Sequence, residues 1–177
     1  MTNAVLPHFR ARKSGTLVFI SSLSGWFGHP FTGAYASSKF AVEGLVESLA
    51  RETAHIPGIR TTMIEPGQFR TKLLAPENML NQVSEIEEYT EKSKETIQSF
   101  VDANDKQRGD PVKLVKVVVD LVRGEGVAGS KVAKGGGGKL PLRLPLGPDC
   151  YEVVKGKCEE TLGVLEEWKD VINSTDL

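Results

Sequence analysis

The protein is a chain of 177 residues with a formal net charge of −1 at pH 7. Hydrophobic residues make up 40% and charged residues 25% of the chain, an ordinary mix for one globular domain. Without a net basic field, the composition gives no reason to expect nucleic acid or an anionic membrane as a partner. No apolar run approaches the roughly 20 residues that cross a bilayer, and residues 1–15 lack the apolar core of a signal peptide.

The cysteines give no sign of a metal or redox site. Cys150 and Cys158 are the two cysteines of the chain; they form no CxxC pair and have no histidine nearby. We therefore expect two reduced thiols in a cytoplasmic protein, with no bound metal.

The first part of the chain alternates strand and helix signals. Residues 4–15 suit the end of a helix, and the short apolar run at 16–20 is typical of a buried parallel strand. Small residues and Gly/Pro breaks follow, and apolar residues at four-residue spacing then predict a helix over 35–54. A second strand is predicted at 59–67, where Pro-Gly stops it.

The second part is mostly helical. Charged amphipathic spacing predicts a helix or helix pair over 78–101, and capping residues frame a helix over 110–124. Prolines restrict the predicted strand at 140–147 to a sheet edge or strand end, and residues 151–172 read as a final helix after a low-complexity glycine linker at 135–138. The order β-α-β-α-α-β-α predicts an α/β fold with a parallel sheet covered by helices.

One segment of the predicted helix, "YASSK", carries acid–base chemistry. Tyr35 and Lys39 are four residues apart, so both side chains lie on one helical face. A tyrosine normally ionises near pH ~10, and a nearby ammonium favours the phenolate. The pair would make Tyr35 a general acid or base near neutrality, although Tyr-x-x-x-Lys alone also occurs by chance.

Two further elements fall at the carboxyl ends of the predicted strands, where parallel sheets place their ligands. Ser22 follows the strand at 16–20, and its hydroxyl could donate to a substrate oxygen or merely cap backbone groups. Pro66 and Gly67 end the second strand, where freed backbone groups could hold a planar amide or form an ordinary turn.

Together these motifs resemble the classical short-chain dehydrogenase/reductase family over about residues 4–75. The family pattern has a serine after a strand, Tyr-x-x-x-Lys thirteen residues later, and a strand ending in Pro-Gly with a threonine shortly after. Ser22 lies thirteen residues before Tyr35, and "PGQFRT" supplies Pro66, Gly67 and Thr71.

The resemblance implies a role for each matching residue. Tyr35 would exchange a proton with the substrate oxygen, Lys39 would favour the phenolate and hold the nicotinamide ribose, and Ser22 would orient the substrate. The segment 66–71 would seat the nicotinamide amide, with Phe69 contributing backbone groups. The implied cofactor is NAD or NADP, the implied substrate is a small carbonyl or alcohol, and a homodimer formed through the Tyr35 helix is possible.

The resemblance also implies a partial doubly wound, Rossmann-type sheet that lacks its N-terminal half. We expect a single truncated NAD(P)-binding domain over 1–177. Its catalytic half would be 1–75, a substrate-covering helical segment about 76–109, and a C-terminal helix, strand and helix 110–177.

Several alternatives remain open. The glycine-rich turn that cradles a pyrophosphate in this family is missing, and "GEGVAG" at 124–129 matches G-x-G-x-x-G only literally. It follows a predicted helix and not a strand, and we interpret it as a helix stop and loop. The chain could therefore be a non-catalytic fragment or interaction module of the same ancestry. A hydrolase built on Ser22 is less consistent with the sequence, since it has no G-x-S-x-G elbow.

Overall fold

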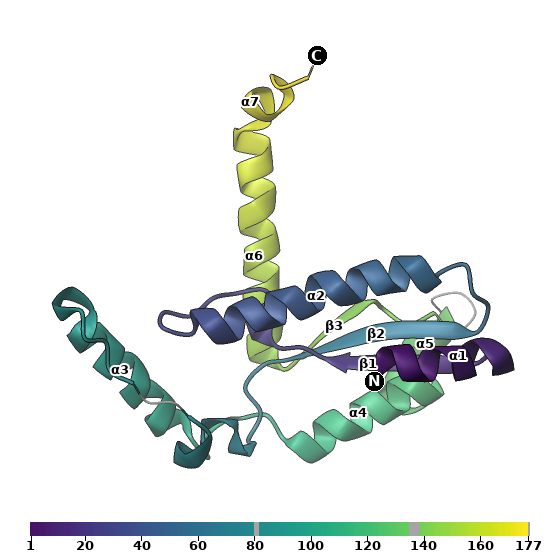
Figure 1. The fold of residues 1–177 in the computed structure, drawn as a ribbon, viewed down its shortest axis with the longest axis horizontal. Helices are drawn as coiled ribbons and strands as arrows, with labels where there is room; N and C mark the ends of the chain where they lie inside the picture. The colour runs from purple at the N-terminus through teal and green to yellow at the C-terminus, as the bar shows by residue number, and fades with distance from the viewer. Residues whose placement is uncertain (80–81, 135–138, 177) are drawn as a thin grey trace.

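The computed structural model describes residues 1–79, 82–134 and 139–176 (Figure 1). Its strands and short 3₁₀ turns are β1 Gly15–Ile20, β2 Ile59–Pro66, β3 Arg143–Leu146, η1 Leu23–Gly25, η2 Lys72–Leu74 and η3 Pro76–Asn78. Its helices are α1 Thr2–Arg12, α2 Gly33–Thr53, α3 Glu87–Ala103, α4 Pro111–Arg123, α5 Gly126–Lys134, α6 Pro148–Glu167 and α7 Lys169–Asn173.

The three strands form a parallel sheet in the order β1-β2-β3. The register places Gly15 opposite Ile59 and Met63 opposite Arg143. β2 is the middle strand, and its residues 62–65 are completely buried. The predicted parallel α/β sheet is confirmed, and the proline-containing β3 lies at an edge as expected.

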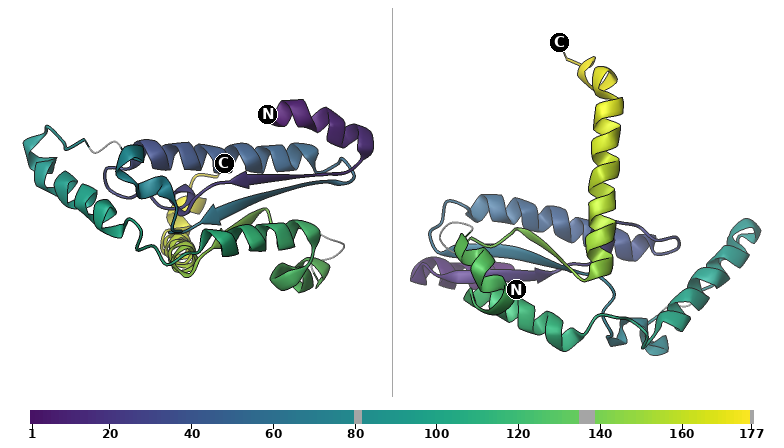
Figure 2. Two further views of the ribbon diagram at one scale, coloured as in Figure 1. Left: turned by 90° about the horizontal axis from the view of Figure 1, so that it is seen from below. Right: turned by 180° about the vertical axis from the view of Figure 1, so that it is seen from behind.

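Helices cover both faces of the sheet. α2 packs on one face and α4 on the other, so the molecule has three layers (Figure 2). Ile64 of β2 and Leu121 of α4 meet in the apolar core on the α4 side. α4 has both predicted end signals: Asp110 accepts the Val112 N–H at 2.8 Å, and Gly124 ends the helix in the left-handed conformation at φ 70°.

α3 and α6, with α7 at the far end of α6, project from this layered body (Figure 1). α3 begins at residue 87, later than predicted. Only the start of α6 is anchored, by the buried Cys150, and Trp168 separates α6 from α7. The apolar stripe of the predicted final helix is therefore largely exposed, with 61% of Leu162 and 46% of Ile172 accessible.

The expectation at 124–129 is wrong in one respect. A helix, α5, opens at Gly126 and packs against α4, whereas the sequence suggested a loop. Gly126 has φ 57°, so it makes a left-handed turn from which α5 starts. The motif still follows a helix instead of a strand, so the strand–turn–helix context of a dinucleotide fingerprint is missing. The predicted glycine linker at 135–138 lies outside the described residues.

No helix in the described ranges is both long and apolar enough to cross a membrane.

Candidate active site

Tyr35 and Lys39 lie in the first two turns of α2, on the same face. The Nζ atom of Lys39 is 5.6 Å from the centre of the Tyr35 ring and 3.4 Å from the carbonyl oxygen of Ile20, at the end of β1. Tyr35 is 37% exposed, so part of it can be approached from solvent. The structure thus brings the motif to the carboxyl edge of the sheet, where the sequence predicted it.

Ser22 stands between β1 and η1, and α2 packs against this turn. Its hydroxyl oxygen accepts the backbone N–H of Ser24 at 3.1 Å. The capping role considered for Ser22 is therefore present. A hydroxyl that accepts one hydrogen bond still has its own proton to donate, so capping does not prevent a second bond to a substrate oxygen.

The segment 66–71 is held by its own backbone and by α6. The N–H of Gly67 donates to Leu146 O at 2.9 Å, and the N–H of Gln68 donates to Asp149 Oδ2 at 2.6 Å. A Cβ at Gly67 would lie 2.3 Å from Asp149 Oδ1, so a side chain there would displace the Asp149 carboxylate from the turn. These contacts fix the conformation of the turn.

Further along the same segment, one backbone donor is left over. Thr71 caps η2 by accepting the Leu73 N–H at 3.3 Å, and Arg70 N–H donates to Gly109 O at 2.9 Å. Within the described residues the Phe69 N–H has no partner. Of the backbone groups that the sequence assigned to an amide ligand, Phe69 N–H is thus one that remains available.

The sequence reasoning missed a cluster of polar side chains beneath this edge, which we call the buried acid pair: Glu43 of α2 and Glu65 of β2. They are 3% and 0% exposed. Arg143 of β3 approaches Glu43 with Nη1 3.5 Å from Oε2, and its guanidinium carbon lies 5.0 Å from the centre of the Trp26 ring. The signal available in the sequence was a glutamate between Ile64 and Pro66, at the end of a predicted strand.

Burial determines the electrostatics of this cluster. It raises the pKa of Glu65 from 4.5 to about 7, and the charge of Glu43 acts in the same direction. The indole N–H of Trp26 opposes this shift without reaching hydrogen-bond geometry. Burial also raises the pKa of the Cys150 thiol to about 12, with the Glu65 charge contributing. The Cys150 thiol donates to the Glu65 carbonyl oxygen at 3.1 Å.

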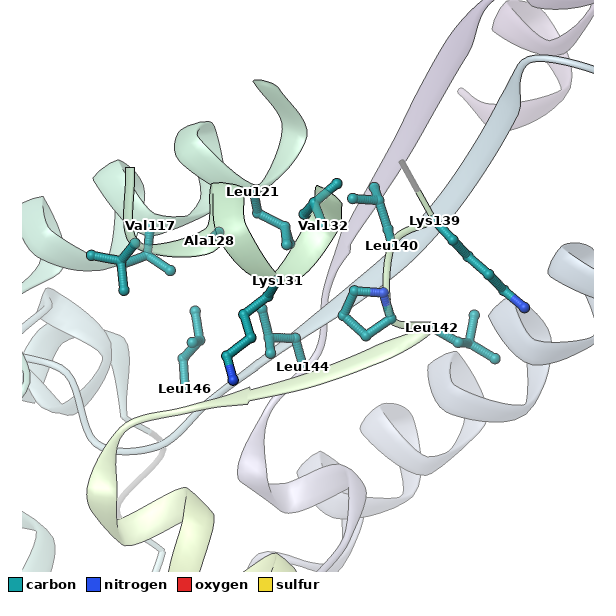
Figure 3. Close-up of a pocket in the computed structure, with 12 residues that line it drawn as sticks. Val117, Leu121, Ala128, Lys131, Val132, Lys139, Leu140, Leu142, Leu144 and Leu146 are labelled. Carbon is teal, nitrogen blue, oxygen red and sulfur yellow. The ribbon is translucent and has the colours of Figure 1, made fainter. Parts of the chain in front are cut away.

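The pocket in Figure 3 belongs to another part of the molecule. It has a volume of about 680 Å³ and lies between α4, α5 and β3, with Leu121, Val132 and Leu144 among its walls. None of the candidate site residues lines it. Its apolar lining marks incomplete packing of α5 on the sheet, away from the Tyr35 edge.

In the described ranges, no group of three or more His, Cys, Asp or Glu side chains is arranged to hold a metal ion.

Comparison with known proteins gives the class of this chain. The family model described as short chain dehydrogenase matches residues 1–81. Oxidoreductase BOA17 of Botryotinia fuckeliana is 34% identical over 172 residues, which cover 97% of this chain and 57% of that protein. The uncharacterized oxidoreductase YusZ of Bacillus subtilis is 32% identical over 144 residues, covering 80% and 51%.

The fold agrees with these sequence relatives. A short-chain dehydrogenase from Streptomyces avermitilis superposes with a TM-score of 0.74 at 33% identity, covering 99% of this chain and 58% of that one. The chain belongs to the short-chain dehydrogenase/reductase family and carries part of its Rossmann-type sheet. It spans between about half and three fifths of the length of these relatives.

Proposed function

We propose that the chain is part of an oxidoreductase that acts on a small carbonyl or alcohol substrate, with Tyr35 as the general acid or base. The observation that carries the proposal is the position of Lys39, whose Nζ lies beside the Tyr35 ring and 3.4 Å from the β1 carbonyl of Ile20. This contact holds the ammonium at the sheet edge, on the same face of α2 as the Tyr35 phenol, so the acid–base residue and its lysine stand together there.

The remaining steps assign one task to each side chain. Tyr35 donates its proton to a carbonyl oxygen during reduction and takes it back from the hydroxyl during oxidation. Ser22, kept in place by its bond with the Ser24 N–H, donates a hydrogen bond to the same oxygen and orients it. Removing a general acid such as the one proposed at Tyr35 typically costs about 10²–10⁴-fold in rate.

The cofactor we propose is NAD or NADP, which when bound supplies or accepts the hydride. The chain has groups that suit its nicotinamide end: the Lys39 ammonium for the ribose and, for the amide, the Phe69 N–H, which has no partner among the described residues. Pro66, Gly67 and Thr71 shape the turn that presents Phe69. Among the described residues, no glycine-rich turn has the strand–turn–helix context that a pyrophosphate needs, and the G-x-G-x-x-G match at 124–129 follows a helix.

That last observation supports a second candidate, a protein of the same ancestry that binds no dinucleotide. The two candidates share one fold and differ in cofactor binding. In both, the domain division predicted at residues 75 and 109 is part of the proposal.

The deciding experiment is a titration of the protein with NADH and NADPH, followed by nicotinamide fluorescence. Lys39→Met is the test variant. Lys113→Met is the matched control, because Lys113 is exposed on α4, on the other side of the sheet. Saturable binding that is lost in Lys39→Met and kept in Lys113→Met supports the enzyme. No binding by the folded protein supports the second candidate.

Tyr35→Phe then separates binding from chemistry. This change removes one hydroxyl and keeps the ring beside Lys39, so cofactor binding should persist while turnover of a carbonyl substrate falls by about 10²-fold or more. Tyr151→Phe is its control, because Tyr151 is an exposed tyrosine of α6. Equal turnover in the two variants would remove Tyr35 from the mechanism.

We also propose that two copies pair through α2. Phe40 and Leu45 on this helix are 48% and 66% exposed, so both leave apolar surface that the core does not cover. Sedimentation of the protein and of a Leu45→Glu variant tests this: a dimer that becomes a monomer supports the interface, and a monomer in both refutes it.

A further inference from the structure

Burying two carboxyl groups side by side has a high electrostatic cost unless something neutralises one of them. Few groups around the buried acid pair can neutralise either carboxyl. All four carboxylate oxygens of Glu43 and Glu65 are buried with no hydrogen-bond partner in the part of the chain that the structure describes. The nearest cation, Arg143, stays 3.5 Å from Glu43.

Arg143 is also shared. Its Nη2 lies 3.2 Å from Glu47 Oε2, one turn further along α2. Glu47 in turn accepts a hydrogen bond from the exposed Arg51 at 2.7 Å. Arg143 is therefore divided between Glu43 and Glu47, and within the described residues no cation lies at salt-bridge distance from Glu65.

The remaining neighbours add no positive charge. On the α6 side, Cys150 gives a neutral thiol and Asp149 an exposed carboxyl. On the η1 side, the buried Trp26 Nε1 and Ser21 Oγ are unpartnered within the described residues. The thiol, the indole N–H and the hydroxyl can donate hydrogen bonds, but they carry no positive charge. A retained proton is therefore the remaining way to avoid two negative charges on the buried acid pair.

The pair also supports the turn that carries Ser22. Gly25 of η1 packs directly on Glu43: a Cβ there would lie 2.8 Å from Oε1. Trp26, which ends η1, stacks over Arg143. The turn is therefore held at its end by the cluster and at its start by the Ser22 cap.

We propose that Glu43 and Glu65 hold one proton between them and that this protonated pair positions the Ser22 turn. Both residues are positioning residues, since neither reaches the surface. The proposal rests on the proposed function only where it treats Ser22 as a site residue; the shared proton and its effect on the turn are independent of any cofactor.

Loss of the proton leaves two adjacent anions beneath η1. Their repulsion displaces Glu43 from Gly25, and the Trp26 indole meets a new charge. The fluorescence of Trp26 should therefore change in a single transition centred near the pKa of Glu65, about 7. The amide resonances of Ser24 and Gly25 should shift with the same midpoint.

The experiment uses a Trp168→Phe background. The chain has two tryptophans, and Trp168 lies 52% exposed at the far end of α6, so Trp26 becomes the sole emitter. Emission and amide shifts are followed from about pH 5 to about pH 9, across the pKa range of a raised carboxyl. Glu43→Gln and Glu65→Gln should each abolish the transition. Glu47→Gln, on the exposed side of the same Arg143, should retain it.

A constant emission and constant amide shifts in the background protein would overturn the proposal. So would a transition that survives in both Glu43→Gln and Glu65→Gln. Infrared difference spectra of the unsubstituted protein give a second test that needs no substitution at the pair. The C=O stretch of one neutral carboxyl should vanish over the same pH range, and its absence would also refute the shared proton. None of these measurements needs cofactor, so this proposal and the oxidoreductase proposal can fail separately.

Discussion

The raised pKa of Glu65 predicts how the stability of the protein depends on pH. The folded state keeps this carboxyl protonated up to about pH 7, whereas the unfolded chain loses the proton near 4.5. Between these values the folded state binds more protons, so the free energy of unfolding falls as pH rises. The stabilisation is fully present below pH 4.5 and is lost as pH rises through about 7.

The size of the effect follows from the two pKa values. Each pH unit of difference corresponds to about 1.4 kcal/mol, so the ceiling for Glu65 is about 3 kcal/mol. Glu65→Gln cannot ionise and should escape this loss. Relative to the unsubstituted protein, the variant should therefore gain up to about 3 kcal/mol of stability between pH 5 and pH 8.

Urea unfolding at several pH values measures this difference directly. Glu47→Gln is the control with the opposite sign. The hydrogen bond and charge of Arg51 lower the pKa of Glu47, so Glu47 stabilises the fold above its unfolded pKa and loses that effect only as pH falls. Glu47→Gln should therefore show the same fall in the free energy of unfolding above pH 5 as the unsubstituted protein. Parallel stability curves for Glu65→Gln and the unsubstituted protein would refute the assignment of the proton to this pair.

Three further outcomes follow from local geometry. In the folded protein a maleimide should label the exposed Cys158 and spare the buried Cys150, whose thiol is protonated, and denaturant should expose the second thiol to labelling. Gly58→Ala should cost at least ~2 kcal/mol in urea unfolding, because Gly58 has φ 77° and the new Cβ would lie 1.9 Å from Lys13 O. Asp110→Ala should cost about 1 kcal/mol by loss of the α4 cap, also measured in urea. An equal labelling rate for both thiols, or unchanged unfolding midpoints, would contradict the corresponding contact.

Local signals explain which parts of the fold the sequence could predict. The strand at 16–20, the Pro-Gly stop after β2 and the two ends of α4 each depend on neighbouring residues, and all are found. The edge position of β3 followed from the prolines of this segment, which have no N–H to donate to a ladder. The onset of α5 was missed because a glycine reads equally well as a stop or as a left-handed start.

Long-range contacts explain what the sequence could not predict. Glu43 resembles a solvated helix residue until Gly25 and Arg143 close over it. The same limit applies in reverse to α6, where Leu162 and Leu165 suit a core but remain 61% and 49% exposed. In both cases the pattern along one element is insufficient, because burial depends on segments distant in the sequence.

The face of α2 that meets the edge of the sheet connects these observations. Residues at four-residue spacing share a helical face, and here that row consists of Tyr35, Lys39, Glu43 and Glu47. Lys39 reaches the end of β1, while Glu43 and Glu47 face Arg143 of β3. The same helix thus contacts β1 through Lys39 and β3 through Glu43 and Glu47. A shift of α2 that separates the two ionised carboxylates should therefore also move Lys39 relative to the Ile20 carbonyl. Ionisation of the pair should therefore disturb the proposed catalytic lysine together with the Ser22 turn, and a Lys39→Met variant should leave the Trp26 transition in place while abolishing cofactor binding.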